Sequence, residues 1–72
     1  MKKRYFYVDY QWPPGCRGCE RETVAVPDDG SPTAEMAKVA IERLNKHIGQ
    51  EVRVLRYNKL PSNYKPRGNE IE

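Results

Sequence analysis

Two cysteines, Cys16 and Cys19, stand at C-x-x-C spacing inside the turn-rich stretch PPGCRGCERE. Two thiolates at this spacing in a turn can bind one Zn²⁺, and the pattern forms the first half of many structural zinc sites. The second half would need two more ligands, and the chain offers a single histidine, His47, besides carboxylates. Zinc at Cys16 and Cys19 is therefore the less favoured interpretation, and two reduced thiols without any cofactor are the favoured one.

Catalytic chemistry is not indicated either. A thioredoxin-type cysteine pair begins a helix, whose N-terminus lowers the pKa of the first thiol, whereas these cysteines stand between two predicted strands. The chain has no Gly-rich phosphate loop, and no serine or cysteine has an evident base partner. We therefore expect a protein that is not an enzyme.

The composition bounds the remaining possibilities. A chain of 72 residues with 38% hydrophobic content can form one small domain, whose core is limited by its size. Its net charge of +3 permits an anionic partner without requiring one. No run approaches the roughly 18 apolar residues of a membrane span, and the basic start lacks the apolar core of a signal peptide. We expect a cytoplasmic protein with no membrane contact.

Alternating and helical hydrophobic patterns predict the elements that position these residues. Strands are expected at residues 3–12, 23–26 and 51–57, because aromatic and β-branched residues alternate there between two faces. A helix is expected at about 32–48, where apolar residues recur at three- and four-residue spacings before Gly49. Residues 58–72 carry prolines and asparagines with almost no periodicity, which predicts an extended, mobile tail.

This order of elements predicts an α+β fold of the ββαβ type. A right-handed crossover through the helix makes the second and third strands parallel, so that the first strand lies between them and antiparallel to both. The sheet order is then 2-1-3, with the helix on one face. Residues 1–57 would form the domain, and residues 58–72 the tail. The expected core residues are Phe6, Val8, Tyr10, Val24, Val26, Val52 and Val54.

The other face of the sheet is the first candidate binding surface. If alternation holds, it carries aromatic rings mixed with cations and one leucine. Such surfaces stack the bases of single-stranded RNA or DNA, and the same composition marks protein interfaces. An ordinary strand face without a partner is the third interpretation, since tyrosine favours strands regardless of function. The residues expected on this face are Lys3, Tyr5, Tyr7, Arg53, Leu55 and Tyr57.

The hairpin loop and the tail are further candidate surfaces. Arg17 and Arg21 project from the cysteine loop and could contact a protein partner. In the tail, cations and a tyrosine alternate with prolines, so the tail could lie along a groove or an RNA backbone and become ordered on binding. The tail residues concerned are Lys59, Tyr64, Lys65 and Arg67.

In its size, its basic balance, its aromatic first strand and its tail, the chain resembles the small host-takeover proteins of bacteriophages, in particular RNA polymerase-binding inhibitors and antitermination proteins. The resemblance rests on no specific motif and transfers no binding residues. It implies a partner on RNA polymerase or an associated factor, possible contact with RNA, and a role in transcription regulation. Two alternatives stay open, namely an independent single-stranded RNA or DNA-binding module and an inhibitor of a CRISPR nuclease complex.

Overall fold

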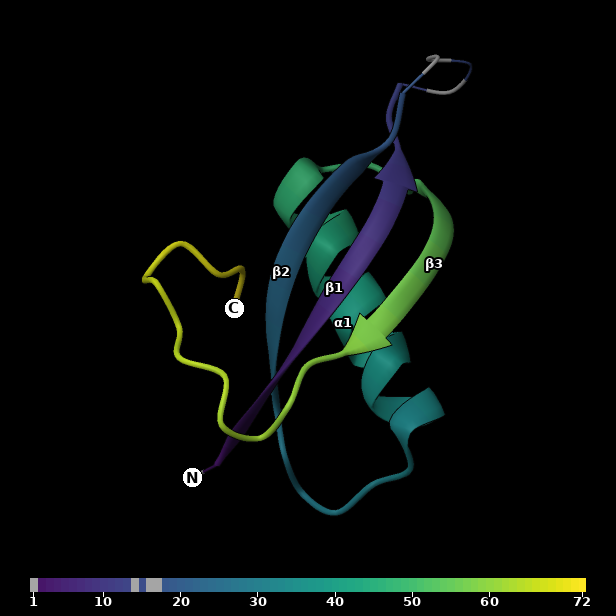
Figure 1. Cartoon of the computed structure of the whole chain (residues 1–72). Helices are drawn as coiled ribbons and strands as arrows, with labels where there is room; N and C mark the ends of the chain where they lie inside the picture. Colours follow the sequence, from purple (N-terminus) through teal and green to yellow (C-terminus); the bar gives the residue numbers. More distant parts are fainter. Residues whose placement is uncertain (1, 14, 16–17) are drawn as a thin grey trace.

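The computed structural model describes residues 2–13, 15 and 18–72, and it contains three strands and one helix (Figure 1). In chain order these are β1 (Lys3–Gln11), β2 (Glu20–Pro27), α1 (Thr33–Ile48) and β3 (Arg53–Lys59). The strands form one antiparallel sheet in the order β2-β1-β3. The predicted α+β fold and strand order are confirmed, and α1 lies against one face of the sheet only (Figure 1).

The largest differences from the predicted strand bounds are at the start of β2 and in β3. β2 begins at Glu20, three residues before the predicted start at residue 23, because Glu20 to Glu22 pair with Val8 to Tyr10 of β1. β3 runs from residue 53 to residue 59, two residues later than predicted. The residues that extend the start of β2 and the end of β3 beyond the predicted bounds, 20–22 and 58–59, are all polar. Their strand conformation comes from backbone pairing with β1.

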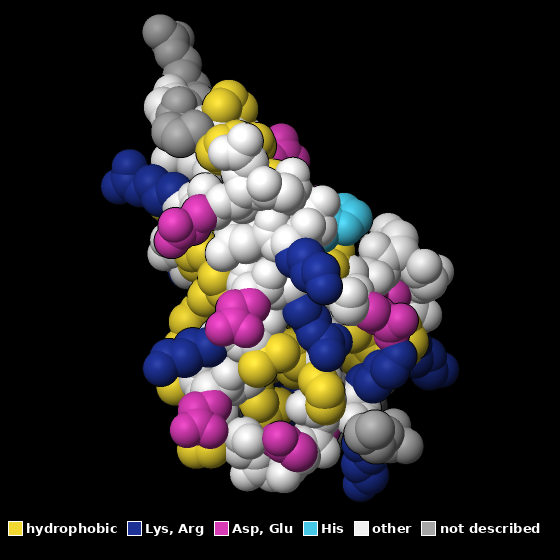
Figure 2. All heavy atoms as spheres, turned by 180° about the vertical axis from the view of Figure 1, so that it is seen from behind, with side chains coloured by type: hydrophobic (Ala, Val, Ile, Leu, Met, Phe, Trp, Pro, Cys, Tyr) yellow, Lys and Arg dark blue, Asp and Glu magenta, His cyan; other side chains and the backbone are white. Residues whose placement is uncertain are grey.

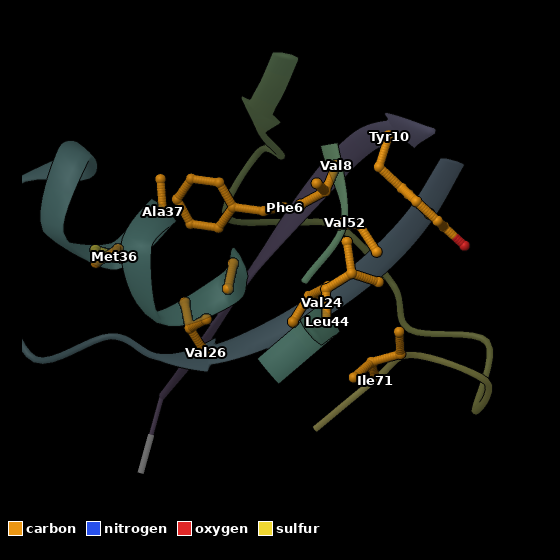
Figure 3. Packing of buried hydrophobic residues seen from close by; sticks show 11 residues of the cluster. Phe6, Val8, Tyr10, Val24, Val26, Met36, Ala37, Leu44, Val52 and Ile71 are labelled. Atoms are coloured by element: carbon orange, nitrogen blue, oxygen red, sulfur yellow. The ribbon is translucent and has the colours of Figure 1, made fainter. Parts of the chain in front are cut away.

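The core lies between α1 and the sheet (Figure 3). Phe6 and Val8 of β1, Val24 of β2, and Ala40 and Leu44 of α1 have no exposed surface. Six of the seven predicted core residues are buried, and Val54 packs against them as a partly buried side chain. Two further residues that the sequence pattern assigned to the tail, Leu60 and Ile71, are also buried.

Helix α1 ends as its sequence predicts. Gly49 adopts a left-handed conformation with φ of 88°, which a glycine tolerates without strain, and its N–H donates to the carbonyl oxygen of Asn45 at 2.8 Å. The side-chain oxygen of Asn45 accepts a hydrogen bond from the N–H of Val52 at 2.9 Å. These bonds fix the short connection that leads from α1 into β3.

The predicted extended and mobile tail is not confirmed, because residues 60–72 pack on the domain. The chain leaves β3, crosses the face of the sheet opposite α1 and reaches the outer edge of β2 (Figure 1). There the N–H of Ile71 donates to Thr23 and the N–H of Ala25 donates to Ile71, at 2.9 and 2.7 Å. The side chain of Ile71 joins the core, which anchors the far end of this segment as Leu60 anchors its start.

Replacing Ile71 with alanine should lower the free energy of unfolding by about 2 kcal/mol, the lower end of the range for buried isoleucine truncations. Ile71 is 6% exposed, so the truncation removes core contacts as well as the anchor. Urea denaturation measures the difference. Asn69→Ala, at an exposed position of the same segment, is the control and should unfold like the wild type. Equal stability of the Ile71 variant and the wild type would show that this segment does not stabilise the domain.

Candidate functional site

A β-bulge in β3 changes which residues lie on the uncovered face of the sheet. Tyr10 pairs with Val54 and Asp9 pairs with Arg56, so Leu55 is an extra residue between them. One inserted residue turns all the following side chains to the opposite face. The prediction that Tyr57 lies among the tyrosines of the uncovered face is therefore wrong, whereas Leu55 is the bulge residue and has no partner in β1.

Downstream of the bulge, β3 presents different side chains to each face. Tyr57 lies opposite the buried Val8, on the face that α1 covers, with its ring centroid 6.3 Å from that of Phe6. Arg56 takes its place on the uncovered face, opposite Asp9. Arg53 precedes the bulge and pairs with Gln11, so it remains on the uncovered face as predicted.

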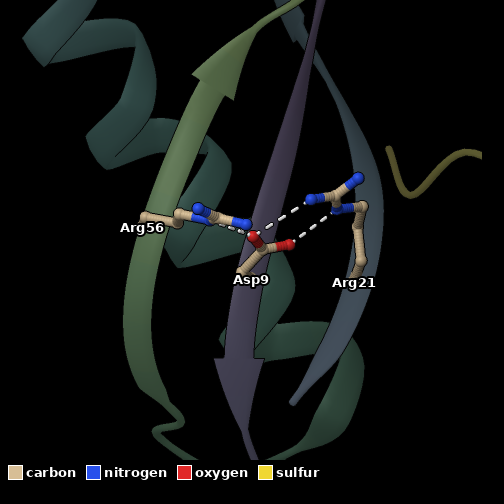
Figure 4. Close-up of polar contacts among 3 residues, drawn as sticks. All are labelled: Asp9, Arg21 and Arg56. Carbon is tan, nitrogen blue, oxygen red and sulfur yellow. Dashed lines mark hydrogen bonds and ion pairs between the residues drawn. The ribbon is translucent and has the colours of Figure 1, made fainter.

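Asp9 stands at the centre of the uncovered face and binds two arginines, one from each neighbouring strand (Figure 4). Arg21 of β2 donates from Nε to Oδ1 at 2.7 Å and from Nη2 to Oδ2 at 3.2 Å. Arg56 of β3 donates from Nε to Oδ2 at 2.6 Å. We call these three residues the Asp9 cluster. Its carboxylate joins all three strands, while both arginine side chains remain about half exposed or more.

The two arginines determine the ionisation of Asp9. Their hydrogen bonds, that of Arg21 foremost, lower the pKa of Asp9 from 3.8 to about 2, against the opposing effect of burial. A carboxylate whose side chain is only 7% exposed would otherwise be costly to leave ionised. The cluster ties the three strands together. Because it carries two positive charges and one negative charge, it also leaves a net positive surface.

Both tyrosines of β1 that were predicted to offer open rings are in contact with other side chains. The ring of Tyr5 lies against that of Tyr64, with centroids 5.0 Å apart, where the C-terminal segment crosses the sheet. The guanidinium carbon of Arg21 lies 4.9 Å from the centroid of Tyr7. Neither ring is a free platform on which a base could stack in this conformation.

Glu70 holds the C-terminal segment in the conformation that places Tyr64 over Tyr5. Its carboxylate accepts hydrogen bonds from the backbone N–H groups of Arg67 and Gly68 and from the hydroxyl of Tyr64, at 2.9 to 3.0 Å. These donors, the N–H of Arg67 first, lower the pKa of Glu70 from 4.5 to about 2. The same contact raises the pKa of the Tyr64 hydroxyl.

The remaining predicted residues are dispersed over the molecule. Lys3 forms an ion pair with Glu72, and Lys59 donates to the hydroxyl of Thr33 at 3.2 Å on the helix side. Lys65 and Arg67 are exposed in the C-terminal segment. Arg21 belongs to β2 and not to the loop.

The cysteine loop falls partly outside the described residues. Cys16 and Arg17 both lie outside them. The predicted zinc-ligand role of Cys16 and the predicted partner contact of Arg17 therefore concern residues that the structure does not describe. Cys19 is described, and it is an exposed free cysteine. Among residues 2–13, 15 and 18–72 no group of three or more potential metal ligands occurs.

Exposed apolar side chains gather on β3. Leu55 is 45% exposed and Tyr57 is 40% exposed, and Arg53, Arg56 and Lys59 are exposed beside them. No strand pairs with the outer edge of β3 in the described part of the chain, so alternate backbone N–H and C=O groups point outward there. We call these five side chains and this edge the β3 rim.

Arg56 and the role of Asp9 were missed by the sequence pattern. Strict alternation placed Arg56 on the helix face, because nothing in EVRVLRY marks a bulge. One signal was present: Asp9 is the only acidic residue in the aromatic first strand, and an acid in a central strand needs cations opposite it. Arg21 and Arg56 are the residues that satisfy this requirement.

No helix in the described residues is long and apolar enough to cross a membrane. No protein-family profile, curated protein or solved structure matches this chain.

Proposed function

We propose that this chain is a small non-enzymatic regulatory protein that binds another protein through the β3 rim. The observation that carries the proposal is the combination of an unpaired strand edge with exposed Leu55 and Tyr57. Aromatic and arginine side chains around an apolar residue are the composition of interface hot spots. An unpaired edge can also accept a partner strand through main-chain hydrogen bonds.

The chemistry of the rim favours an acidic, extended segment as the partner. Arg53, Arg56 and Lys59 give β3 three positive charges and no negative charge. A second copy of β3 would bring like charges together, whereas a segment with Asp or Glu on one face would pair with Arg53 and Arg56 on the uncovered face. Protein binding is favoured over base stacking, because the rings of Tyr5 and Tyr7 are each already in contact with another side chain.

The resemblance to phage host-takeover proteins makes RNA polymerase, or a factor associated with it, the partner that we propose to test first. Binding there would modulate transcription by inhibition or antitermination. A CRISPR nuclease complex is the second candidate partner. Both are large assemblies that a small protein could regulate by occupying one surface.

Affinity capture from a bacterial lysate tests the proposal when it is combined with matched variants. Leu55→Glu places a charge in the centre of the β3 rim, and Val39→Glu makes the same kind of change at an exposed apolar position of α1. Wild type and Val39→Glu should capture the same partner, identified by mass spectrometry, and Leu55→Glu should lose at least about 90% of it, as for a hot-spot residue. Equal capture by all three proteins, or no specific capture by any, would contradict the proposal.

A further inference from the structure

A groove lined by cations runs along the β2 side of the molecule, between the second half of α1 and the two ends of the chain. Two clefts, of 280 and 360 Å³, form it and share Arg43 and Glu72 as lining residues. We call it the basic groove. The charged and titratable residues that line it are Lys2, Lys3, Arg43, Lys46, His47 and Glu72.

The charge of the groove is strongly one-sided. Four Lys and Arg side chains line it, and Glu72 is the one acidic side chain among the described lining residues. In the whole chain the two signs are much closer, with 13 Lys and Arg against 10 Asp and Glu. Figure 2 shows several Lys and Arg side chains gathered in the right half of the helix side, which is the β2 side of the molecule. The groove is therefore a local positive site that the sequence order alone does not reveal.

Two of the groove cations, Arg43 and Lys3, are held in place by contacts with other parts of the chain. Arg43 donates from Nη1 to the carbonyl oxygen of Ala25 at 2.8 Å, which anchors its guanidinium between α1 and β2. Lys3 is bound to the carboxylate of Glu72, which raises the pKa of Lys3. Glu72 is 58% exposed in its side chain, so it can leave the groove without unpacking the core. The chain's own carboxylate therefore occupies a position where an external anion could bind.

We propose that the basic groove binds the phosphate backbone of a single-stranded nucleic acid, and that Glu72 competes with the phosphates for the cations. The proposal is independent of the β3 rim, which lies on the opposite edge of the sheet. The two clefts share Arg43, and together they offer four cations that successive phosphates could contact. No aromatic side chain lines the clefts among the described residues, so we expect binding without base preference.

An acidic protein segment is the competing ligand, and the lining of the larger cleft disfavours it. The larger cleft offers no apolar side chain among the described residues, and the smaller one adds Val26 and Pro27. Peptide binding draws much of its energy from buried apolar contacts. Phosphate binding needs only the positive charges and their counterion release.

Fluorescence anisotropy with a labelled oligouridylate of about 12 nucleotides tests the proposal, since small single-strand-binding domains cover sites of this size. Lys46→Glu should weaken binding at least about fivefold at low salt, because it reverses one groove charge. Lys38→Glu is the matched control: Lys38 is exposed on α1, lines neither cleft and undergoes the same charge change. It should change the affinity by less than about twofold.

Glu72→Gln provides the opposite change at the same site. Removing the competing carboxylate should tighten RNA binding by about two- to threefold, as expected for one exposed charge. Between about 50 and 200 mM salt, the logarithm of the wild-type association constant should fall with a slope near −2, corresponding to about three contacted phosphates. Circular dichroism confirms that each variant is folded before binding is measured.

Several results would overturn the proposal. One is an equal loss of affinity in Lys46→Glu and Lys38→Glu, which would indicate a response to overall charge. Another is an unchanged affinity in Glu72→Gln, which would remove Glu72 from the binding site. A labelled polyglutamate of the same length that binds more tightly than the oligouridylate would assign the groove to acidic protein segments.

Discussion

Replacing Phe6 with alanine should lower the melting temperature of this protein by roughly 12 °C or more, the largest effect of any single truncation that we predict. Phe6 has no exposed surface, lies on the central strand and packs between α1 and the ring of Tyr57. Truncating a buried phenylalanine costs about 3 to 5 kcal/mol, because apolar contacts are lost and a cavity remains.

The small size of the domain makes this loss severe. A chain of 72 residues has a total stability of roughly 4 to 11 kcal/mol, so the substitution removes a large part of it. Thermal unfolding followed by circular dichroism measures the effect. Phe6→Leu conserves most of the buried volume and should cost less than about 1.5 kcal/mol. An alanine variant that melts within a few degrees of the leucine variant would contradict the packing described for Phe6.

Replacing Asp9 with asparagine should cost about 2 kcal/mol at neutral pH, and this cost should disappear in acid. The two arginines lower the pKa of Asp9 from 3.8 to about 2. At about 1.4 kcal/mol per pKa unit, this difference corresponds to on the order of 2 kcal/mol of stability. The side chain is 7% exposed, so solvent screens these contacts far less than it screens an exposed ion pair.

The pH dependence follows from the direction of the shift. A carboxylate whose pKa is lower in the folded state stabilises the fold above its unfolded pKa, near 4. That stabilisation is mostly lost as the pH falls from about 4 to about 2, where Asp9 is protonated in the unfolded state and half protonated in the folded state. The difference in unfolding free energy between wild type and Asp9→Asn should therefore shrink towards zero over this range.

Urea denaturation of both proteins at a series of pH values tests this expectation. The comparison isolates Asp9, because Glu70 and the other acids titrate equally in wild type and variant. Asp28→Asn is the control: its nearest cation, Nη1 of Arg4, is 4.0 Å away, so we expect an effect within about 0.5 kcal/mol. A constant difference between wild type and Asp9→Asn from pH 2 to pH 7 would mean that the ionised carboxylate does not stabilise the sheet.

Most of the fold could be predicted because its determinants are local. Alternation in the first strand separated Phe6 and Val8 from Tyr5 and Tyr7, and the structure places the two pairs on opposite faces. The apolar stripe and Gly49 located α1 to within a residue. The handedness of the crossover then determined the strand order, since it depends on strand twist and not on particular side chains.

The candidate site was harder to predict, because it depends on register. The bulge at Leu55 exchanges the faces of Arg56 and Tyr57, and a bulge follows from how the whole of β3 fits β1. Because of the bulge, the aromatic platform expected around Tyr57 does not form. The structure has the Asp9 cluster on the uncovered face and the exposed β3 rim at the edge.

The sequence alone determined the elements, the sheet order and most of the core, because each depends on a pattern within one segment or on chain handedness. The tertiary structure decided which β3 side chains share a face with Asp9, where the C-terminal segment packs, and that Lys2, Arg43 and Lys46 line one groove. These features join residues that are distant in the chain. Their contacts depend on strand register and on apolar anchors such as Ile71. Polar residues precede and follow Ile71 in the sequence, and it becomes part of the core only because it lies beside Val24.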